Sequence, residues 1–199
     1  MTERGYHHGN LRQALLERAW ATIDSDGLDA LSLRRLARDV GVSHGASARH
    51  FADRTALLDA ISVEGFARMN DALTAAVASE TQFAGQLRAA GLAYIGFAVE
   101  HPAILDLMYK AKHHPDASPE LVRLSRASMA VVIEFVGEAQ ARGEVRPGDV
   151  ERQSLVVFAA VHGVASLATD DLLDGVPWRD AAEATIDAVL SSLTGVATS

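Results

Sequence analysis

One short segment, residues 43–54, concentrates side chains that can donate hydrogen bonds to an anion or to a base edge. His44, Arg49, His50 and Arg54 carry imidazole or guanidinium groups. Such groups pair with phosphate oxygens and with the acceptor atoms that bases present in the major groove of DNA. Few residues of this segment could contribute to a hydrophobic core, so we predict an exposed surface that contacts nucleic acid.

These side chains divide by the part of DNA that each is expected to contact. His44 and the backbone at Gly45 are predicted to reach base edges, with Arg49 as a further candidate. His50 and Arg54 are predicted to contact phosphates, and Arg54 lies at the start of the following helix, where backbone N–H groups and the helix dipole also favour an anion. The complete set predicted to contact DNA is Ser32, Ser43, His44, Gly45, Ala46, Ala48, Arg49, His50 and Arg54.

Catalytic and metal chemistry find less support in the sequence. It contains neither a Gly-rich phosphate loop nor a His-Glu-x-x-His motif, so we predict no catalytic residue, no enzyme activity and no cofactor. His113 and His114, together with His101, His162 and Asp106, leave a metal site open. Adjacent histidines on a loop point apart as often as together, so a polar surface loop is the favoured interpretation and no metal is predicted.

Two short helices joined by a tight turn must position the polar segment. The apolar residues of 33–40 recur at i, i+3, i+4 and i+7 behind the expected N-cap Ser32. Gly41 is expected to end this helix with a positive φ, and Ser43 to cap a second helix that runs to His50. Helix, turn, helix is the geometry that places a recognition helix in the major groove. The same spacing also fits an ordinary helical hairpin.

The rest of the chain also has a helical period. Only 6% of its 199 residues are aromatic and five are proline, while Leu and Ala dominate, so we predict an all-α fold of about nine helices. We place a three-helix DNA-binding domain at 1–55 and a C-terminal helical bundle at 56–199. The remaining helices are expected from the cap Asn10 to Asp26 and over 53–79, 81–100, 103–110, 121–142, 149–171 and 178–193.

The segment VSHGASARHFADRTALL resembles the recognition-helix signature of the tetracycline-repressor (TetR) family, which reads Val-Ser, two or three variable residues, a hydrophobic residue, Tyr, any residue, His-Phe, two residues, Lys and Leu. In this sequence Ser47 stands at the hydrophobic position, Ala48 at the Tyr and Arg54 at the Lys. The segments YIGFAVEHPAILDLMY and FAAVHGVASL resemble the C-terminal domain of a subgroup with a Trp-His-Gly pattern, in which Phe158 replaces the Trp. The resemblance implies a homodimeric DNA-binding regulator with a partly hollow C-terminal bundle.

Aromatic, methionine and histidine side chains of the C-terminal part indicate a site for a small molecule. A ligand site is mostly apolar with a few polar groups, and His101 and His162 would supply those groups. Each of these residues also fits a packed core. The residues predicted to bind the ligand are Tyr94, Phe97, His101, Met108, Tyr109, Met129, Phe158 and His162.

The last two predicted helices have more apolar surface than one side of a bundle can bury. Packed against their copies, they would form a four-helix interface, with small residues on the first and larger ones on the second. The alternative is that both helices only cover their own domain. The residues predicted at the interface are Leu155, Ala159, Gly163, Ile186, Val189, Leu190 and Leu193.

Charge and composition limit the cellular setting. The net charge is −8, yet the first sixty residues hold eight basic and eight acidic residues, so the acidic excess lies in the later part. The chain has no cysteine, and we find no signal peptide and no run long enough to span a membrane. We therefore predict a cytoplasmic regulator, most often a repressor, that binds a palindromic operator and is released by a small ligand. The alternative is a ligand-binding protein of the same fold with weakened DNA binding, because of Ser47 and Ala48.

Overall fold

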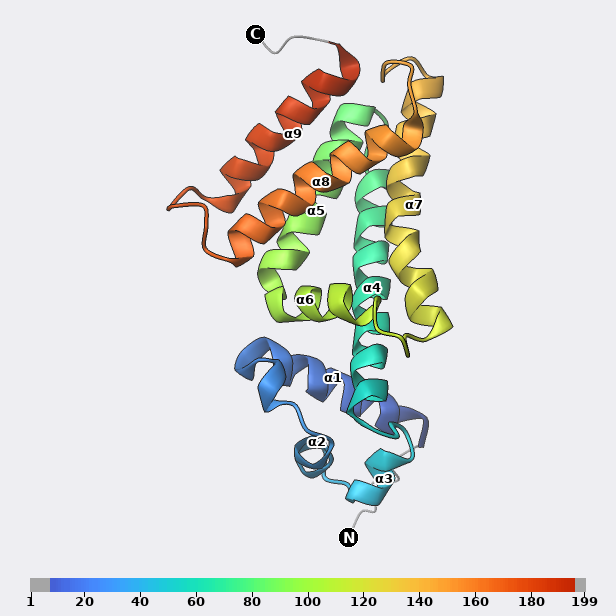
Figure 1. Cartoon of the computed structure of the whole chain (residues 1–199), viewed down its shortest axis with the longest axis vertical. Coiled ribbons are helices and arrows are strands. Elements are labelled where there is room, and N and C mark those ends of the chain that lie inside the picture. Colours follow the sequence, from blue (N-terminus) through green and yellow to red (C-terminus); the bar gives the residue numbers. More distant parts are fainter. Residues whose placement is uncertain (1–7, 196–199) are drawn as a thin grey trace. The chain divides into compact units, whose positions relative to one another are not determined.

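The computed structural model describes residues 8–195, and side chains from residue 11 onward. Within this part the chain forms nine α-helices, one 3-10 turn and no strand (Figure 1), which confirms the all-α prediction. The elements in order are α1 (His8–Asp26), η1 (Leu28–Ala30), α2 (Leu33–Val40), α3 (His44–Ala48), α4 (Arg54–Ala78), α5 (Phe83–Glu100), α6 (Pro102–Ala111), α7 (Pro119–Ala141), α8 (Val150–Thr169) and α9 (Trp178–Thr194).

The helix boundaries agree with the local signals at most ends. One start differs, because α1 begins at His8, before the expected cap Asn10. An N-cap preference is worth only about 1 kcal/mol, so a helix readily extends past such a residue. The recognition helix is also shorter than expected: α3 ends at Ala48, and the polypeptide turns through Arg49 and His50.

The described chain divides into two compact units. The first comprises residues 8–65 and 103–122, and the second comprises 66–102 and 123–195. In the first unit α1, α2 and α3 contact one another. Gly65 of α4 lies so close to α6 that an added Cβ would be 2.5 Å from the sulfur of Met108. A side chain at this position would therefore force the two helices apart.

The core of the second unit is formed mainly by α5, α7, α8 and α9. Phe83 of α5 and Phe135 of α7 have ring centroids 5.9 Å apart, and both are fully buried. Helix α9 contributes Ile186, Val189 and Leu193 to the same cluster. Figure 1 shows α5, α8 and α9 packed together within this unit. In the described residues no helix has the length and hydropathy that a membrane span requires.

Candidate functional site

Side-chain caps and one glycine build the helix-turn-helix as the sequence indicates. The Ser32 hydroxyl oxygen accepts a hydrogen bond from the backbone N–H of Arg35 at 3.2 Å. At the other end of α2, Gly41 has φ 78°, which glycine adopts without a Cβ penalty. The Ser43 hydroxyl oxygen then accepts from the N–H of Ala46 at 3.2 Å. These local bonds set where α2 stops and α3 starts.

Helix α3 presents four of the predicted DNA-contacting residues to solvent. His44, Gly45, Ala48 and Arg49 are exposed, whereas Ala46 and His50 are half-buried. Phe51, directly after them, is only 2% exposed and anchors the end of the segment in the core. The exposed face therefore consists of one imidazole, one guanidinium and small residues that allow close approach.

The two positions where the sequence departs from the family signature behave differently. Ser47 is fully buried, and its hydroxyl donates to the carbonyl oxygen of His44 at 2.8 Å. Its polar atom is thus satisfied inside the helix, which keeps the cost of placing a hydroxyl at an apolar position small. Ala48 is exposed and offers only a methyl group to any partner.

The letters from Gly41 to Gly45 also match a Gly-x-Ser-x-Gly pattern. In hydrolases that pattern lies on a sharp turn between a strand and a helix, with the serine hydroxyl exposed as a nucleophile. In this chain a helix precedes the pattern, and the Ser43 oxygen caps α3. The pattern here is a helix cap.

Ion pairs engage some arginines of the first unit and leave others for a partner. Arg18 pairs with Asp39 at 2.9 Å, and Arg35 pairs with Asp26 at 2.6 Å. The hydrogen bond from Arg35 lowers the pKa of the Asp26 carboxyl. Arg54 donates from Nη2 to the carbonyl oxygen of a residue in η1 at 3.1 Å, so it connects the start of α4 to that turn.

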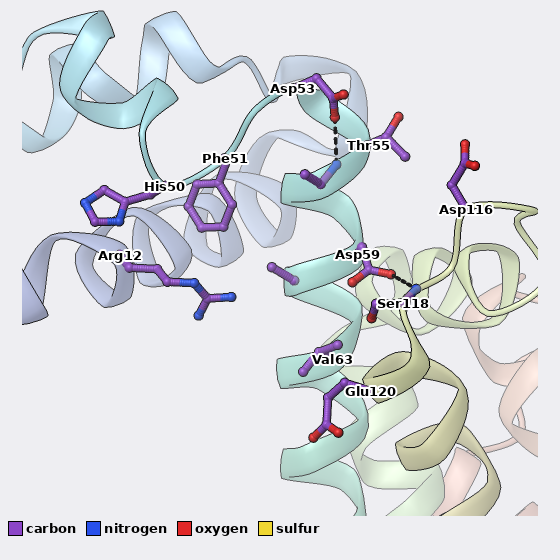
Figure 2. Close-up of a pocket in the computed structure, with 12 residues that line it drawn as sticks. Arg12, His50, Phe51, Asp53, Thr55, Asp59, Val63, Asp116, Ser118 and Glu120 are labelled. Atoms are coloured by element: carbon purple, nitrogen blue, oxygen red, sulfur yellow. Dashed lines mark hydrogen bonds between the residues drawn. The ribbon is translucent and has the colours of Figure 1, made fainter.

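A groove of about 590 Å³ lies in the first unit beside the end of the recognition helix (Figure 2). Arg12 and His50 lie at one end of it, and the guanidinium of Arg12 is 5.4 Å from the centroid of the Phe51 ring. Carboxylates line other parts of the wall. The lining residues are Arg12, His50, Phe51, Asp53, Thr55, Ala56, Asp59, Ala60, Val63, Asp116, Ser118 and Glu120.

The second unit contains an apolar cavity between α4, α5, α7 and α8. Its volume is about 40 Å³, which exceeds the roughly 10–15 Å³ that one water molecule needs but is far below the volume of a drug-sized site. Tyr94 and Ser128 supply its only side-chain hydroxyls. The lining residues are Leu73, Leu87, Ala90, Gly91, Tyr94, Ser128, Val132, Phe135, Val157, Phe158 and Val161.

Both hydroxyls of the cavity already have partners. The Tyr94 hydroxyl and Nδ1 of His162 share a hydrogen bond of 2.8 Å. Ser128 donates to Oδ1 of Asn70 at 2.6 Å. The His162 ring stacks on Phe158 with centroids 5.2 Å apart. The cavity is thus lined by hydrocarbon, with a polar pair at its edge.

Only part of the predicted ligand set gathers at this cavity. Tyr94 and Phe158 line it, and His162 lies behind them. Phe97 and His101 contact each other, with ring centroids 5.3 Å apart, and like Met129 they are not among the lining residues.

Two predicted ligand residues need correction, because Met108 and Tyr109 belong to α6 in the first unit. Met108 is fully buried there beside Gly65, and the ring of Tyr109 lies under the ammonium of Lys112 at 4.3 Å. Sequence reasoning missed most of the actual lining, including Gly91 and Val132. These residues show the same apolar spacing as core residues, so no sequence signal separates them.

Helix α8 has an apolar face that its own unit does not cover. Leu155 is 57% exposed and Leu167 is 42% exposed. Ala159 lies between them on the same face and is also exposed, and a Cβ built on Gly163 would meet no atom within 4 Å. These four residues recur every fourth position, so they form one stripe along the helix.

The predicted interface residues of α9 need correction. Ile186, Val189 and Leu193 are 1%, 6% and 2% exposed and pack in the core of their own unit. They offer no surface to a second copy. Leu190 is half-buried and packs against the same core, so the solvent-facing part of the prediction is the stripe on α8.

Comparisons with protein families cover both parts of the chain. The family model described as bacterial regulatory proteins, tetR family, matches residues 15–61. The model described as tetracyclin repressor-like, C-terminal domain, matches residues 87–193, which is more than half of the chain. A comparison with the curated proteins finds no significant match.

Solved structures share the fold over almost the whole length. A protein with unknown function from Rhodococcus sp. RHA1 is 46% identical, with a TM-score of 0.90, over 96% of this chain and 100% of that chain. A TetR family transcription regulator from Marinobacter aquaeolei VT8 is 16% identical, with a TM-score of 0.71, over 93% and 96%. A bacterial regulatory protein in the tetR family from Rhodococcus RHA1 is 22% identical, with a TM-score of 0.67, over 99% and 100%.

Proposed function

The chain belongs to the TetR family of transcriptional regulators, and from this premise we propose that it is a repressor that binds a palindromic operator as a homodimer and is released by a small ligand. The observation that carries the proposal is the exposed face of α3. His44, Gly45 and Arg49 are exposed there, on a helix whose start is set by a side-chain cap and whose end is anchored by a buried aromatic ring.

DNA reading requires that this face enter the major groove. His44 and Gly45 are placed to approach base edges, with Arg49 as a further contact, and His50 and Arg54 flank them for phosphates. The remaining predicted contacts, Ser32, Ser43, Ala46 and Ala48, surround this face. Because the first sixty residues carry no excess of positive charge, we expect weak binding to unrelated DNA.

Dimer formation would use the stripe of Leu155, Ala159, Gly163 and Leu167 on α8. The small residues at its middle allow two helices to approach closely, and the leucines at its ends would cover the seam. An uncovered apolar face of this kind on a helix is typical of an interaction surface. A two-fold axis through it would place two recognition helices on a palindromic site.

Ligand release would use the apolar cavity. At about 40 Å³ it accepts only a very small group, so an effector of ordinary size must bind a form in which the cavity is wider. A ligand that favours this form about 100-fold changes the equilibrium by about 2.7 kcal/mol. Helix α4 contributes Leu73 to the cavity and begins at Arg54 beside the DNA-reading segment. We expect this continuous helix to carry the change, and the effector to be a largely apolar small molecule.

The alternative function is a ligand-binding protein with weakened DNA binding, and the exposed methyl group of Ala48 favours it. The family signature has Tyr at this position, so one phosphate contact is lost. Fluorescence anisotropy with duplex DNA from upstream of the protein's own gene separates the two functions. Saturable binding at submicromolar protein in 50 mM salt, with a protected palindrome, supports the repressor. No binding at tens of micromolar supports the alternative.

A further inference from the structure

We propose that Arg12 and His50 together form a phosphate-binding site for the DNA backbone at the end of the recognition helix. The inference rests on the proposed DNA binding and adds a contact from α1, which sequence reasoning did not identify. Figure 2 shows both side chains at the same end of the groove, with the ring of Phe51 beside the guanidinium.

The position of Arg12 is defined by an aromatic contact. Its guanidinium lies 5.4 Å from the centroid of Phe51, within the range of a cation–π interaction. Phe51 is 2% exposed and therefore provides a fixed surface. A guanidinium held against a ring keeps its N–H donors available at its edge, and these donors match the oxygens of a phosphate.

The charge of Arg12 is not neutralised by the protein. Among the residues that the structure describes, no carboxylate forms an ion pair or hydrogen bond with Arg12, whereas Arg18 and Arg35 of the same unit are paired with Asp39 and Asp26. An ordered arginine without a carboxylate partner retains its full capacity for an anion. His50 adds a second donor from the residue just before Phe51.

The carboxylates of the groove restrict where an anion can bind. Asp53 accepts from the N–H of Ala56 at 2.8 Å, and Asp59 accepts from the N–H of Ser118 at 2.8 Å. Asp116 and Glu120 lie on the far side from Arg12 in Figure 2. Their negative charge repels a phosphate from the interior, so the site is limited to the end formed by Arg12 and His50.

The geometry favours a phosphate of bound DNA over a free phosphate ion. The site is open and has only one guanidinium and one imidazole, and exposed ionic contacts of this kind contribute about 1 kcal/mol or less. When α3 binds its groove, however, a backbone phosphate is held at high effective concentration. We therefore expect no measurable binding of inorganic phosphate at 10 mM by NMR titration of His50, and a clear contribution to DNA affinity.

The first experiment compares Arg12→Ala with wild type on a footprinted operator duplex and on an unrelated duplex of the same length. The variant should bind both about fivefold more weakly at low salt, because a phosphate contact carries no sequence information. The slope of log K against log salt should fall by about 0.9. Arg126→Ala removes the same charge from an exposed position on α7 and should leave the slope unchanged. Equal melting temperatures exclude unfolding as the cause.

The second experiment replaces single phosphates of the operator by neutral methylphosphonates. In wild type one replacement per half-site should reduce affinity about fivefold, and the same replacement should have no further effect on Arg12→Ala. If the two losses multiply, or if Arg12→Ala binds like wild type, the site is not where we place it. Wild type that binds DNA with an unchanged Arg12→Ala overturns this site alone. Wild type that binds no DNA overturns the proposed function as well.

Discussion

Arg54 donates from Nη2 to the carbonyl oxygen of Leu28 at 3.1 Å. This bond joins the first residue of α4 to the 3-10 turn that follows α1, between residues far apart in sequence. It leaves the other N–H donors of the guanidinium for a phosphate. The same side chain is therefore expected to serve both the packing of the first unit and the binding of DNA.

Arg54→Ala should reduce both properties. The free energy of unfolding should fall by about 1 kcal/mol, because one hydrogen bond from a charged, exposed group is lost. DNA affinity should fall alike for all sequences, with the salt slope lower by about 0.9. Arg54→Lys keeps the charge and should keep the slope. Urea unfolding and anisotropy titrations measure both quantities, and a loss confined to one DNA sequence contradicts the assigned role.

Val132→Phe should block the cavity of the second unit. Val132 lines the cavity, whereas its neighbour Val131 lines a different groove on the same helix, so Val131→Phe is a matched control. Only the first variant should weaken binding of an uncharged apolar dye such as N-phenyl-naphthylamine, by about tenfold or more, at a stability cost of about 1–3 kcal/mol. Operator affinity without ligand should stay within about twofold of wild type. An equal effect of both variants would mean that the dye binds elsewhere.

Leu155→Glu should dissociate the dimer while leaving the fold intact. Leu155 is 57% exposed, so the charge costs little within one chain, but two copies brought into a dry seam cost several kcal/mol. Leu190→Glu is a poorer test, because Leu190 packs against its own core. Sedimentation should show a monomer with weakened operator binding. Ala130→Glu, an exposed position on α7, is the control, and a full dimer of Leu155→Glu at micromolar concentration would place the interface elsewhere.

Glu144 should make part of the stability depend on pH. The hydrogen bond from Arg142, and then that from the backbone N–H of Phe83 at 2.6 Å, lower the pKa of Glu144 from its usual value of 4.5. A lowered pKa in the folded state stabilises the protein above the usual value, and this contribution is lost as the pH falls through the folded value. Thermal melts of wild type should therefore drop below about pH 4.5.

Glu144→Gln removes that titration. The variant should melt at a lower temperature than wild type at pH 7, and the difference should shrink as the pH falls below 4.5. Glu138→Gln is the control, since Glu138 is an exposed and more distant partner of Arg142, at 3.6 Å. A difference for Glu144→Gln that stays constant down to pH 3 would show that its carboxylate charge does not matter.

The helix-turn-helix was predictable because its signals are local. Ser32, Gly41 and Ser43 act on backbone groups within a few residues of themselves, and their chemistry is the same in any helical protein. The spacing of apolar residues likewise indicated helices over nearly the whole chain. Only ends such as that of α1 differ, where competing preferences are worth less than about 1 kcal/mol.

The sequence by itself determined the all-α class, the order of the helices, the helix-turn-helix and the family, because each depends on periodicity or on short-range hydrogen bonds. Only the tertiary structure decided which apolar residues face what. Ile186 and Leu155 have equivalent hydrophobic spacing in sequence, yet one is 1% and the other 57% exposed. The cavity beside Tyr94 and the contact of Arg12 with Phe51 were equally hidden. Such features arise from packing between residues distant in sequence, and that packing is set by shape and excluded volume across several helices, which no single helix encodes.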